Sequence, residues 1–208
     1  MPGLAEDAVE VLNAARVDSA HVVGASMGGM IAQHLALDHR ERVRSLVLAC
    51  TTAGGQGGAP PWRLLAASAL RPLLGARRTF GLVGSTLYAG TTLRNGRERV
   101  LEDLERRIAD GTSPLTVYAQ MGAIAGHDTR LRLRELEGLP TLVLHGRQDA
   151  LVPPARGRDL AELVPGARLE LLPSCGHILT TDAEEATASA IIDHLDRSRA
   201  RSPHISLR

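Results

Sequence analysis

Short apolar runs alternate with stretches of helical apolar spacing along most of the chain. Continuous apolar runs are typical of strands buried on both faces of a parallel sheet, whereas apolar residues three and four positions apart are typical of helices that pack on such a sheet. This alternation predicts an α/β fold with a mostly parallel sheet. The predicted strands are residues 20–25, 43–50, 141–146 and 167–172. The predicted core helices include residues 4–15, with an apolar side made of Leu4, Ala8, Val11, Leu12 and Ala15, and residues 27–38.

A block of helix-like sequence separates the second predicted strand from the third. Glycine and proline interrupt the pattern in residues 51–61, and the turn pairs Asn95-Gly96 and Asp110-Gly111 divide the remainder of the block. Such a block, inserted between two strands, is interpreted as a helical cap over an active site, although similar helices also serve as ordinary packing layers. Its predicted helices are residues 62–74, 77–88, 94–109 and 114–125. The predicted domain division is a core of residues 1–53 and 126–196, a helical cap of residues 54–125 and a flexible basic tail of residues 197–208.

Ser26 lies between the first predicted strand and the helix that comes after it, in the run Gly24-Ala25-Ser26-Met27-Gly28. A G-x-S-x-G pattern at a strand-to-helix turn is typical of a nucleophile elbow. We expect glycine two positions before and two positions after Ser26, because Cβ atoms there would crowd a strained turn. The turn presents the serine hydroxyl and starts a helix at Met27, whose backbone N–H could stabilise an oxyanion. The alternative interpretation is a glycine-rich turn that holds a serine by chance.

The loops after two later strands carry the residues that a nucleophilic serine needs. A serine hydroxyl requires a histidine to take its proton and a carboxylate to orient that histidine. Asp149 follows the strand at residues 141–146, and His177 follows the strand at residues 167–172. Neighbouring parallel strands would bring the two loops together. Each residue also has a simpler interpretation, with Asp149 as a turn residue and His177 as a surface histidine.

The remaining histidines and the two cysteines are expected to have structural roles. His127-Asp128 is a rival acid and histidine pair, but it follows a helix-like segment and is better suited to a loop that returns to the sheet. His145 is expected to line a strand end without catalysing. Cys50 and Cys175 lack metal-ligand spacing, so we expect no metal and no cofactor, and Cys175 is interpreted as a packing residue. The histidines expected to be structural or solvated are His21, His34, His39, His194 and His204.

The order serine, acid, histidine resembles that of the α/β-hydrolase superfamily. Residues 24–29, residues 145–149 with Pro153, and Gly176-His177 are similar to its elbow, acid loop and histidine loop, most of all in the small bacterial esterases and lactonases. The resemblance implies a serine hydrolase that cleaves a small carboxylic ester or lactone through an acyl-enzyme. It implies these roles: Ser26 as nucleophile, His177 as base, Asp149 as orienting acid and Met27 N–H as oxyanion donor. A cofactor-free haloperoxidase-like activity on the same triad stays open.

The resemblance also implies strands ahead of the elbow. Members of the superfamily have further strands before the elbow, and a loop after one of them supplies a second oxyanion N–H. We therefore expect this sequence to be N-terminally truncated, with an exposed sheet edge at residues 20–25 and one oxyanion donor fewer. Self-association through this edge is one consequence. The alternative to an active esterase is a catalytically impaired remnant.

Composition narrows the class of partner. The formal net charge is +1, which gives no strong field for nucleic acid or an anionic membrane. The sequence has no apolar run long enough to span a bilayer and no basic-then-apolar signal pattern at its start. With only two cysteines, a reducing compartment is favoured. We therefore expect a cytoplasmic protein whose partner is a small-molecule ester or lactone.

Overall fold

The computed structural model describes residues 1–55, 66, 69–70, 73–109 and 113–201. The predicted helix at residues 62–74 lies largely outside these described residues, as do residues 202–208 of the predicted tail. Residues 197–201 belong to the last helix, so the helix extends into the segment that was predicted to be a flexible tail.

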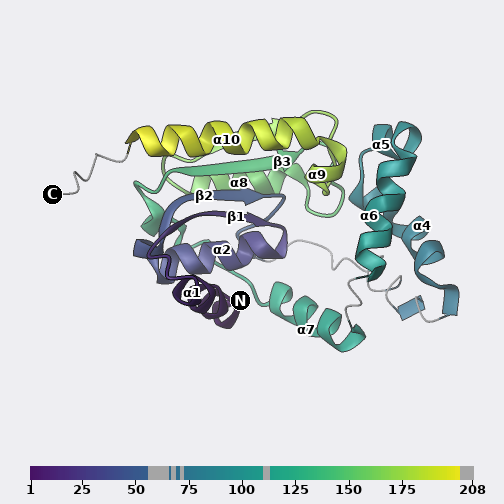
Figure 1. The fold of residues 1–208 in the computed structure, drawn as a ribbon, viewed down its shortest axis with the longest axis horizontal. Helices are drawn as coiled ribbons and strands as arrows, with labels where there is room; N and C mark the ends of the chain where they lie inside the picture. Colours follow the sequence, from purple (N-terminus) through teal and green to yellow (C-terminus); the bar gives the residue numbers. More distant parts are fainter. Residues whose placement is uncertain (56–65, 67–68, 71–72, 110–112, 202–208) are drawn as a thin grey trace.

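A parallel sheet forms the centre of the described structure (Figure 1). Its strands, in the order β1-β2-β3-β4, are β1 (Ala20–Ala25), β2 (Val43–Ala49), β3 (Thr141–Gly146) and β4 (Arg168–Leu172). Their carboxyl ends are level, because Ala25 pairs with Ala49, Ala49 with Leu144, and Gly146 with Leu172. The loops that leave β1, β3 and β4 therefore start from one edge of the sheet. The predicted α/β class with a mostly parallel sheet is confirmed.

Helices cover both faces of the sheet. Alternate side chains of a strand point to opposite faces, so Leu46 and Leu48 join the apolar cluster under α2, while Val47 and Ala49 join the cluster under α10. A fully buried leucine stabilises the fold by roughly 1.5–3 kcal/mol. One face carries α1 (Pro2–Ala14), α2 (Met27–Asp38) and α8 (Pro154–Leu163), and the other carries α9 (Leu179–Asp182) and α10 (Glu184–Arg201). Two short 3-10 helices, Arg40–Arg42 and Leu133–Leu136, precede β2 and β3.

The first helix packs through a face that overlaps only in part with the one predicted. Ala5 is 1% exposed, and Ala8 and Val9 pack against the core, whereas Val11 is 68% exposed and Leu4 is 38% exposed. The small side chains of Ala5 and Ala8 let α1 lie close to α2, with which it makes its main contact. The packed face thus shares Ala8 with the predicted face but leaves Leu4 and Val11 exposed.

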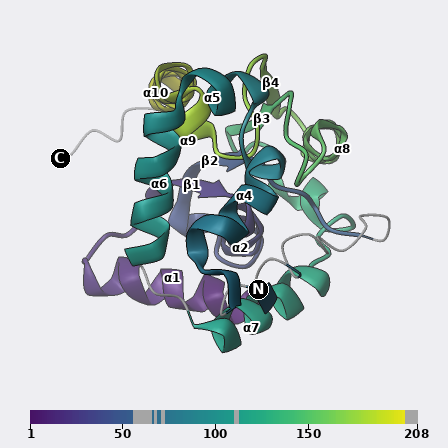
Figure 2. The ribbon, with the colours of Figure 1, turned by 90° about the vertical axis from the view of Figure 1, so that its right-hand side faces the viewer.

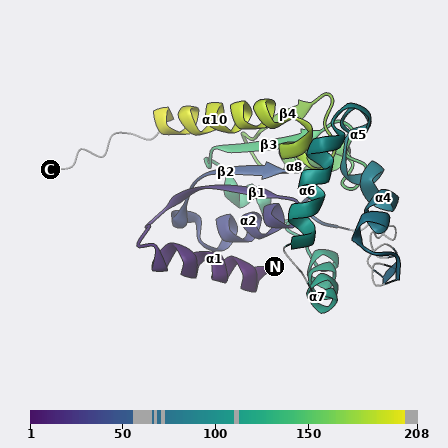
Figure 3. The ribbon, with the colours of Figure 1, turned by 45° about the vertical axis from the view of Figure 1, so that its right-hand side comes forward.

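Helices between β2 and β3 lie beyond the carboxyl ends of the strands (Figure 1, Figure 2). The predicted helix at residues 94–109 is divided at Gly96, which separates a short helix from a longer one. The last helix of the block lies apart from the others, near the amino-terminal end of α1 (Figure 3). These helices are α4 (Ala76–Leu87), α5 (Gly90–Asn95), α6 (Arg97–Ala109) and α7 (Pro114–Ala125).

The two connections to this helical block are joined where they leave the sheet. Gly54 and Asp128 form an antiparallel bridge, and Thr129 N–H donates to Ala53 O at 2.9 Å. Gly54 has a φ of +87°, and a Cβ there would collide with the backbone of residue 127. A glycine is therefore required at this crossing.

Within the described residues, every helix is too short or too polar to span a lipid bilayer.

Candidate active site

Ser26 occupies a strained turn between β1 and α2. Its φ is 54° and its ψ is −120°, in a region that a residue with a side chain rarely adopts. Such a conformation costs on the order of 1–3 kcal/mol and persists only where neighbours enforce it. Ser26 N–H donates to Ala49 O at 2.8 Å, and Thr51 Oγ1 donates to Ser26 O at 2.7 Å. Hydrogen bonds from the end of β2 thus hold the elbow in place.

Glycines around the elbow have unequal roles. A Cβ on Gly24 would lie 2.8 Å from Ala32 Cβ and even closer to the backbone of Gly28, so this position requires glycine. A Cβ on Gly28 would meet nothing within 4 Å, so the expectation of crowding two residues after Ser26 is wrong. Gly29 is the crowded position instead, because a Cβ there would lie 2.6 Å from Thr51 Cγ2. The side chain that supports Ser26 O therefore needs the space that Gly29 leaves.

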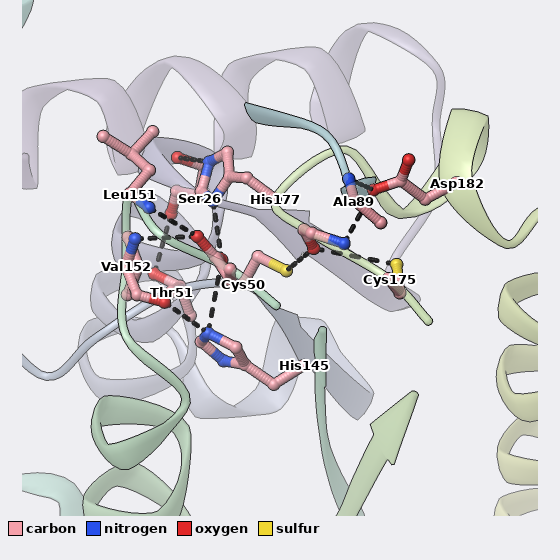
Figure 4. Close-up of polar contacts among 12 residues, drawn as sticks. Ser26, Cys50, Thr51, Ala89, His145, Leu151, Val152, Cys175, His177 and Asp182 are labelled. Atoms are coloured by element: carbon pink, nitrogen blue, oxygen red, sulfur yellow. Dashed lines mark hydrogen bonds and ion pairs between the residues drawn. The ribbon is translucent and has the colours of Figure 1, made fainter. Parts of the chain in front are cut away.

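The structure brings together the three side chains singled out in the sequence (Figure 4). His177 Nδ1 lies 2.8 Å from Asp149 Oδ2, and His177 Nε2 lies 3.0 Å from Ser26 Oγ. A carboxylate only accepts hydrogen bonds, so Nδ1 carries the proton and Nε2 is free to accept from the serine hydroxyl. The three residues come from the loops after β1, β3 and β4. This arrangement can transfer a proton from Ser26 Oγ to His177.

Asp149 is held as a buried, ionised carboxylate. It is 4% exposed, and its Oδ1 accepts hydrogen bonds from Leu151 N at 2.9 Å and Val152 N at 2.8 Å. Burial alone would raise the pKa of Asp149, but hydrogen bonds from His145 and His177, attraction to His177 and the Val152 N–H outweigh it and lower the pKa to about 2. The carboxylate is therefore ready to balance a positive charge on His177 near neutral pH.

His145 contacts the same carboxylate, although the sequence suggested that it only lines the strand end. Its Nε2 lies 2.9 Å from Val152 O and 3.3 Å from Asp149 Oδ2, and its side chain is completely buried. Since a carbonyl oxygen can only accept, Nε2 carries a proton that points to both oxygens. The sequence signal was available, because His145 stands four residues before Asp149 at a strand end. What the sequence did not reveal is the loop path that returns Val152 to the imidazole.

Met27 is the first residue of α2, next to Ser26. The first N–H groups of a helix have no partner within the helix, whereas Gly29 N and Met30 N already donate to Ser26 O at 3.0 and 3.3 Å. The backbone N–H of Met27 therefore lies in the first turn of α2, directly after Ser26, where the sequence led us to expect an oxyanion donor.

The rival pair His127-Asp128 has structural contacts. His127 is 3% exposed, donates from Nε2 to Thr52 O at 3.2 Å and packs edge-on against the His34 ring, with centroids 5.5 Å apart. Asp128 instead forms an ion pair with Arg130 at 2.7 Å. Both residues thus belong to the crossing that joins the helical block to the sheet.

One group with metal-ligand chemistry occurs in the described part of the chain, formed by Cys50, His145 and Asp149. Their ligand atoms lie within 4.8 Å of one another. Burial, reinforced by the nearby Asp149 charge, raises the pKa of the Cys50 thiol well above its usual range, and His145 Nε2 carries a proton. A metal needs a thiolate and a free imidazole nitrogen, so this group does not fit a metal ion as it stands. Burial also raises the pKa of Cys175 to about 12, which suits a packing residue.

Comparisons with known proteins agree with this fold. A family model for the alpha/beta hydrolase fold matches residues 1–183. A poly(3-hydroxyalkanoate) depolymerase of Ectopseudomonas oleovorans is 31% identical over 97% of this chain and 69% of its own length. A pimeloyl-acyl-carrier-protein methyl ester esterase of Nitrosomonas europaea is 33% identical over 75% of this chain and 63% of its own length.

Solved structures give the same result. The enol-lactonase from Burkholderia xenovorans superposes with a TM-score of 0.79 at 25% identity, covering 93% of this chain and 72% of its own. The resemblance inferred from the elbow, the acid loop and the histidine loop is thereby confirmed at the level of the family. The chain belongs to the α/β-hydrolase family of enzymes.

Proposed function

We propose that this protein is a serine hydrolase that cleaves a small carboxylic ester or lactone through an acyl-enzyme. The observation that carries the proposal is the continuous set of hydrogen bonds from Ser26 Oγ through His177 to the buried Asp149 carboxylate, at 3.0 and 2.8 Å. A serine hydroxyl in this setting can lose its proton as it attacks a carbonyl carbon.

The proposed reaction has two halves. Ser26 Oγ bonds to the carbonyl carbon, its proton moves to His177 Nε2, and the carbonyl oxygen becomes an oxyanion beside Met27 N–H. The bond to the leaving oxygen then breaks, and that oxygen takes the proton from His177. In the second half, a water molecule gives a proton to His177 and attacks the acyl-enzyme, and Ser26 recovers its proton as the acid is released. With a lactone, the product is a hydroxy acid, because the leaving oxygen stays attached to the acyl chain.

The substrate class is supported by relatives of two kinds. One is named a methyl ester esterase, and the enol-lactonase shares the fold over most of this chain. Both reactions involve an acyl carbonyl with an oxygen leaving group, which is the bond type that a serine, a histidine and a carboxylate can cleave.

A fluorophosphonate probe tests the nucleophile directly. We expect the probe to label the wild-type protein on the peptide that contains Ser26, and labelling to vanish in Ser26→Ala. Ser19→Ala is the matched control, because Ser19 precedes β1 at the end of the strand opposite to Ser26, and its hydroxyl accepts from Arg44 Nε. Circular dichroism of each variant shows whether the fold is retained.

Hydrolysis assays test the substrate class. Short-chain nitrophenyl esters and a series of lactones should be turned over by the wild-type protein and by Ser19→Ala, with the rate of Ser26→Ala lower by at least about 10³-fold. A folded wild-type protein that neither reacts with the probe nor turns over these compounds would contradict the proposal and favour the catalytically impaired remnant.

A further inference from the structure

The loop that carries His177 is hydrogen-bonded to the end of α4. His177 N and Ile178 N both donate to Leu87 O, at 2.8 and 3.1 Å. Leu87 is the last residue of α4, and carbonyls at a helix carboxyl end have no partner within the helix. The histidine loop thus completes the hydrogen bonding of a helix that lies outside the sheet.

A second connection joins the same two segments through Asp182. The Oδ2 atom of Asp182 accepts hydrogen bonds from Gly176 N at 2.6 Å and from Ala89 N at 2.9 Å (Figure 4). Gly176 directly precedes His177, and Ala89 directly precedes α5. Hydrogen bonds to a carboxylate are stronger than those between neutral groups. One side chain on α9 therefore ties the backbone beside His177 to the connection between α4 and α5.

These segments also pack closely against each other. A Cβ on Gly176 would lie 2.9 Å from Ala89 N, from Leu87 O and from the carbonyl carbon of Tyr88. Ala89 is 0% exposed and Tyr88 is 2% exposed. The Tyr88 hydroxyl donates to Asp103, which belongs to α6. A shift of α4, α5 or α6 would therefore be passed on to the histidine loop.

We propose that Asp182 is a positioning residue. It keeps the His177 imidazole within hydrogen-bond distance of Ser26 by fixing Gly176 against the segment Tyr88-Ala89. This inference rests on the proposed function, in which His177 is the base. Asp182 acts only through backbone N–H groups and has no contact with the reacting atoms. Proton transfer depends on the placement of His177, and a displacement of about 1 Å can cost on the order of 10²-fold in rate. The position of the α4 to α6 helices thereby becomes a determinant of turnover.

Two substitutions at Asp182 separate positioning from general packing. Asp182→Ala removes the acceptor for both N–H groups, and we expect kcat for a nitrophenyl ester to fall by about 10- to 100-fold with KM changed by less than about threefold. Asp182→Asn keeps an oxygen that can accept both hydrogen bonds, so we expect kcat within about threefold of wild type. In the described structure Asp182 Oδ1 is buried without a hydrogen-bond partner, and the amide nitrogen can take its place. The control is Asp159→Ala, an exposed aspartate on α8, which should leave kcat unchanged.

Hydrogen exchange provides a readout that does not depend on activity. In Asp182→Ala, amide exchange should increase together in peptides that cover residues 174–178 and residues 87–90, while Asp159→Ala leaves both unchanged. Failure of the wild-type protein to react with the fluorophosphonate probe would defeat the proposed function, yet the exchange measurement would still test the coupling. Wild-type kcat and wild-type exchange in Asp182→Ala would overturn the inference.

Ala89→Pro breaks the same connection from the other side if Asp182→Ala fails to fold. Ala89 has a φ of −62°, which proline requires, and Tyr88 is extended with φ −114° and ψ 152°, as a residue before proline should be. The substitution removes the Ala89 N–H and places the proline Cδ against Asp182 Oδ2, which lies 2.9 Å from Ala89 N, so the carboxylate can no longer join Gly176 to Ala89. We expect the same 10- to 100-fold loss of kcat. An unchanged kcat in a folded Ala89→Pro protein would overturn the inference.

Discussion

The Nε2 atom of His145 lies 3.3 Å from Asp149 Oδ2, the oxygen that also accepts the hydrogen bond from His177. Because both imidazoles point to one carboxylate oxygen, His145 helps to fix the direction in which Asp149 holds His177. Its ring is itself held against α8, where a Cβ on Gly157 would lie 2.6 Å from His145 Nδ1. His145 thus supports the Asp149 carboxylate that also binds His177.

Removing this support should slow turnover moderately. We expect His145→Met, which has no N–H donor, to lower kcat by about tenfold, because the loss of one hydrogen bond to a charged group is worth roughly 1.5 kcal/mol or more. His145→Gln keeps a donor near the position of Nε2 and should lose less. The measurement is the initial rate on a nitrophenyl ester from about pH 5 to about pH 9, the range in which histidines usually titrate. Equal losses in both variants would show that His145 acts through packing alone.

Stability below neutral pH should depend on His127. Burial, followed by repulsion from a protonated His34, lowers the pKa of His127 to about 4 from its ordinary value of 6.5. The unfolded chain therefore binds a proton at pH values where the folded protein does not. The stability that the neutral, buried His127 contributes is complete above about pH 6.5. As the pH falls toward about 4, the free energy of unfolding decreases by up to about 1.4 kcal/mol per pH unit.

A glutamine at this position tests the contribution. His127→Gln keeps an N–H that can donate to Thr52 O but does not titrate. We would measure the free energy of unfolding in urea at about pH 7 and at about pH 5, within the interval that His127 controls. The loss of this free energy between the two pH values should be smaller in the variant than in wild type. Burial also lowers the pKa of His34, so part of the slope should remain. An identical loss in both proteins would contradict the assignment.

The fold and the meeting of Ser26, Asp149 and His177 could be predicted because their signals are local. Ser26, Asp149 and His177 each follow an apolar strand in the sequence, and parallel strands bring their carboxyl ends together whatever the loops do. Asp182 could not be found in this way, because its partners Gly176 and Ala89 are backbone groups from segments far apart in the chain. Such contacts depend on the three-dimensional path of two loops.

Packing faces were harder to predict than elements. Leucines and valines at helical spacing marked the first helix, yet the face that packs is centred on Ala5 and leaves Leu4 and Val11 exposed. The distance between two helices decides this, and that distance is not encoded in the apolar pattern of either helix. The motif also predicted crowding at Gly28, but after Ser26 the crowded glycine is Gly29, because it faces Thr51. This contact depends on where the chain runs after β2, which the motif does not encode.

The elbow glycines offer a matched pair of substitutions. Gly24→Ala places a Cβ 2.8 Å from Ala32 Cβ, and overpacking of this kind costs about 1–3 kcal/mol of unfolding free energy. It should also displace Ser26 and slow its reaction with the fluorophosphonate probe by about tenfold or more.

Gly28→Ala adds a Cβ in open space within α2, so it should leave stability unchanged or raise it by up to about 1 kcal/mol. Chemical denaturation and labelling rates of the two variants, compared with wild type, decide the question. Equal destabilisation by both would show that the motif glycines are required for another reason.

Self-association is expected through β1. In the part of the chain that the structure describes, β1 pairs only with β2, so the N–H and C=O groups on its other side face outward. Val23 is 49% exposed on this strand, because its side chain points away from the cluster that Val22 joins.

Val23→Lys should raise the dissociation constant of the self-associated species by at least about tenfold, since pairing along this edge would have to bury or crowd a charge. Val11→Lys is the matched control, because Val11 is 68% exposed but lies on α1. Sedimentation velocity over a range of protein concentrations distinguishes the two variants. A monomeric wild-type protein, or equal weakening by both lysines, would rule out the β1 edge as the contact.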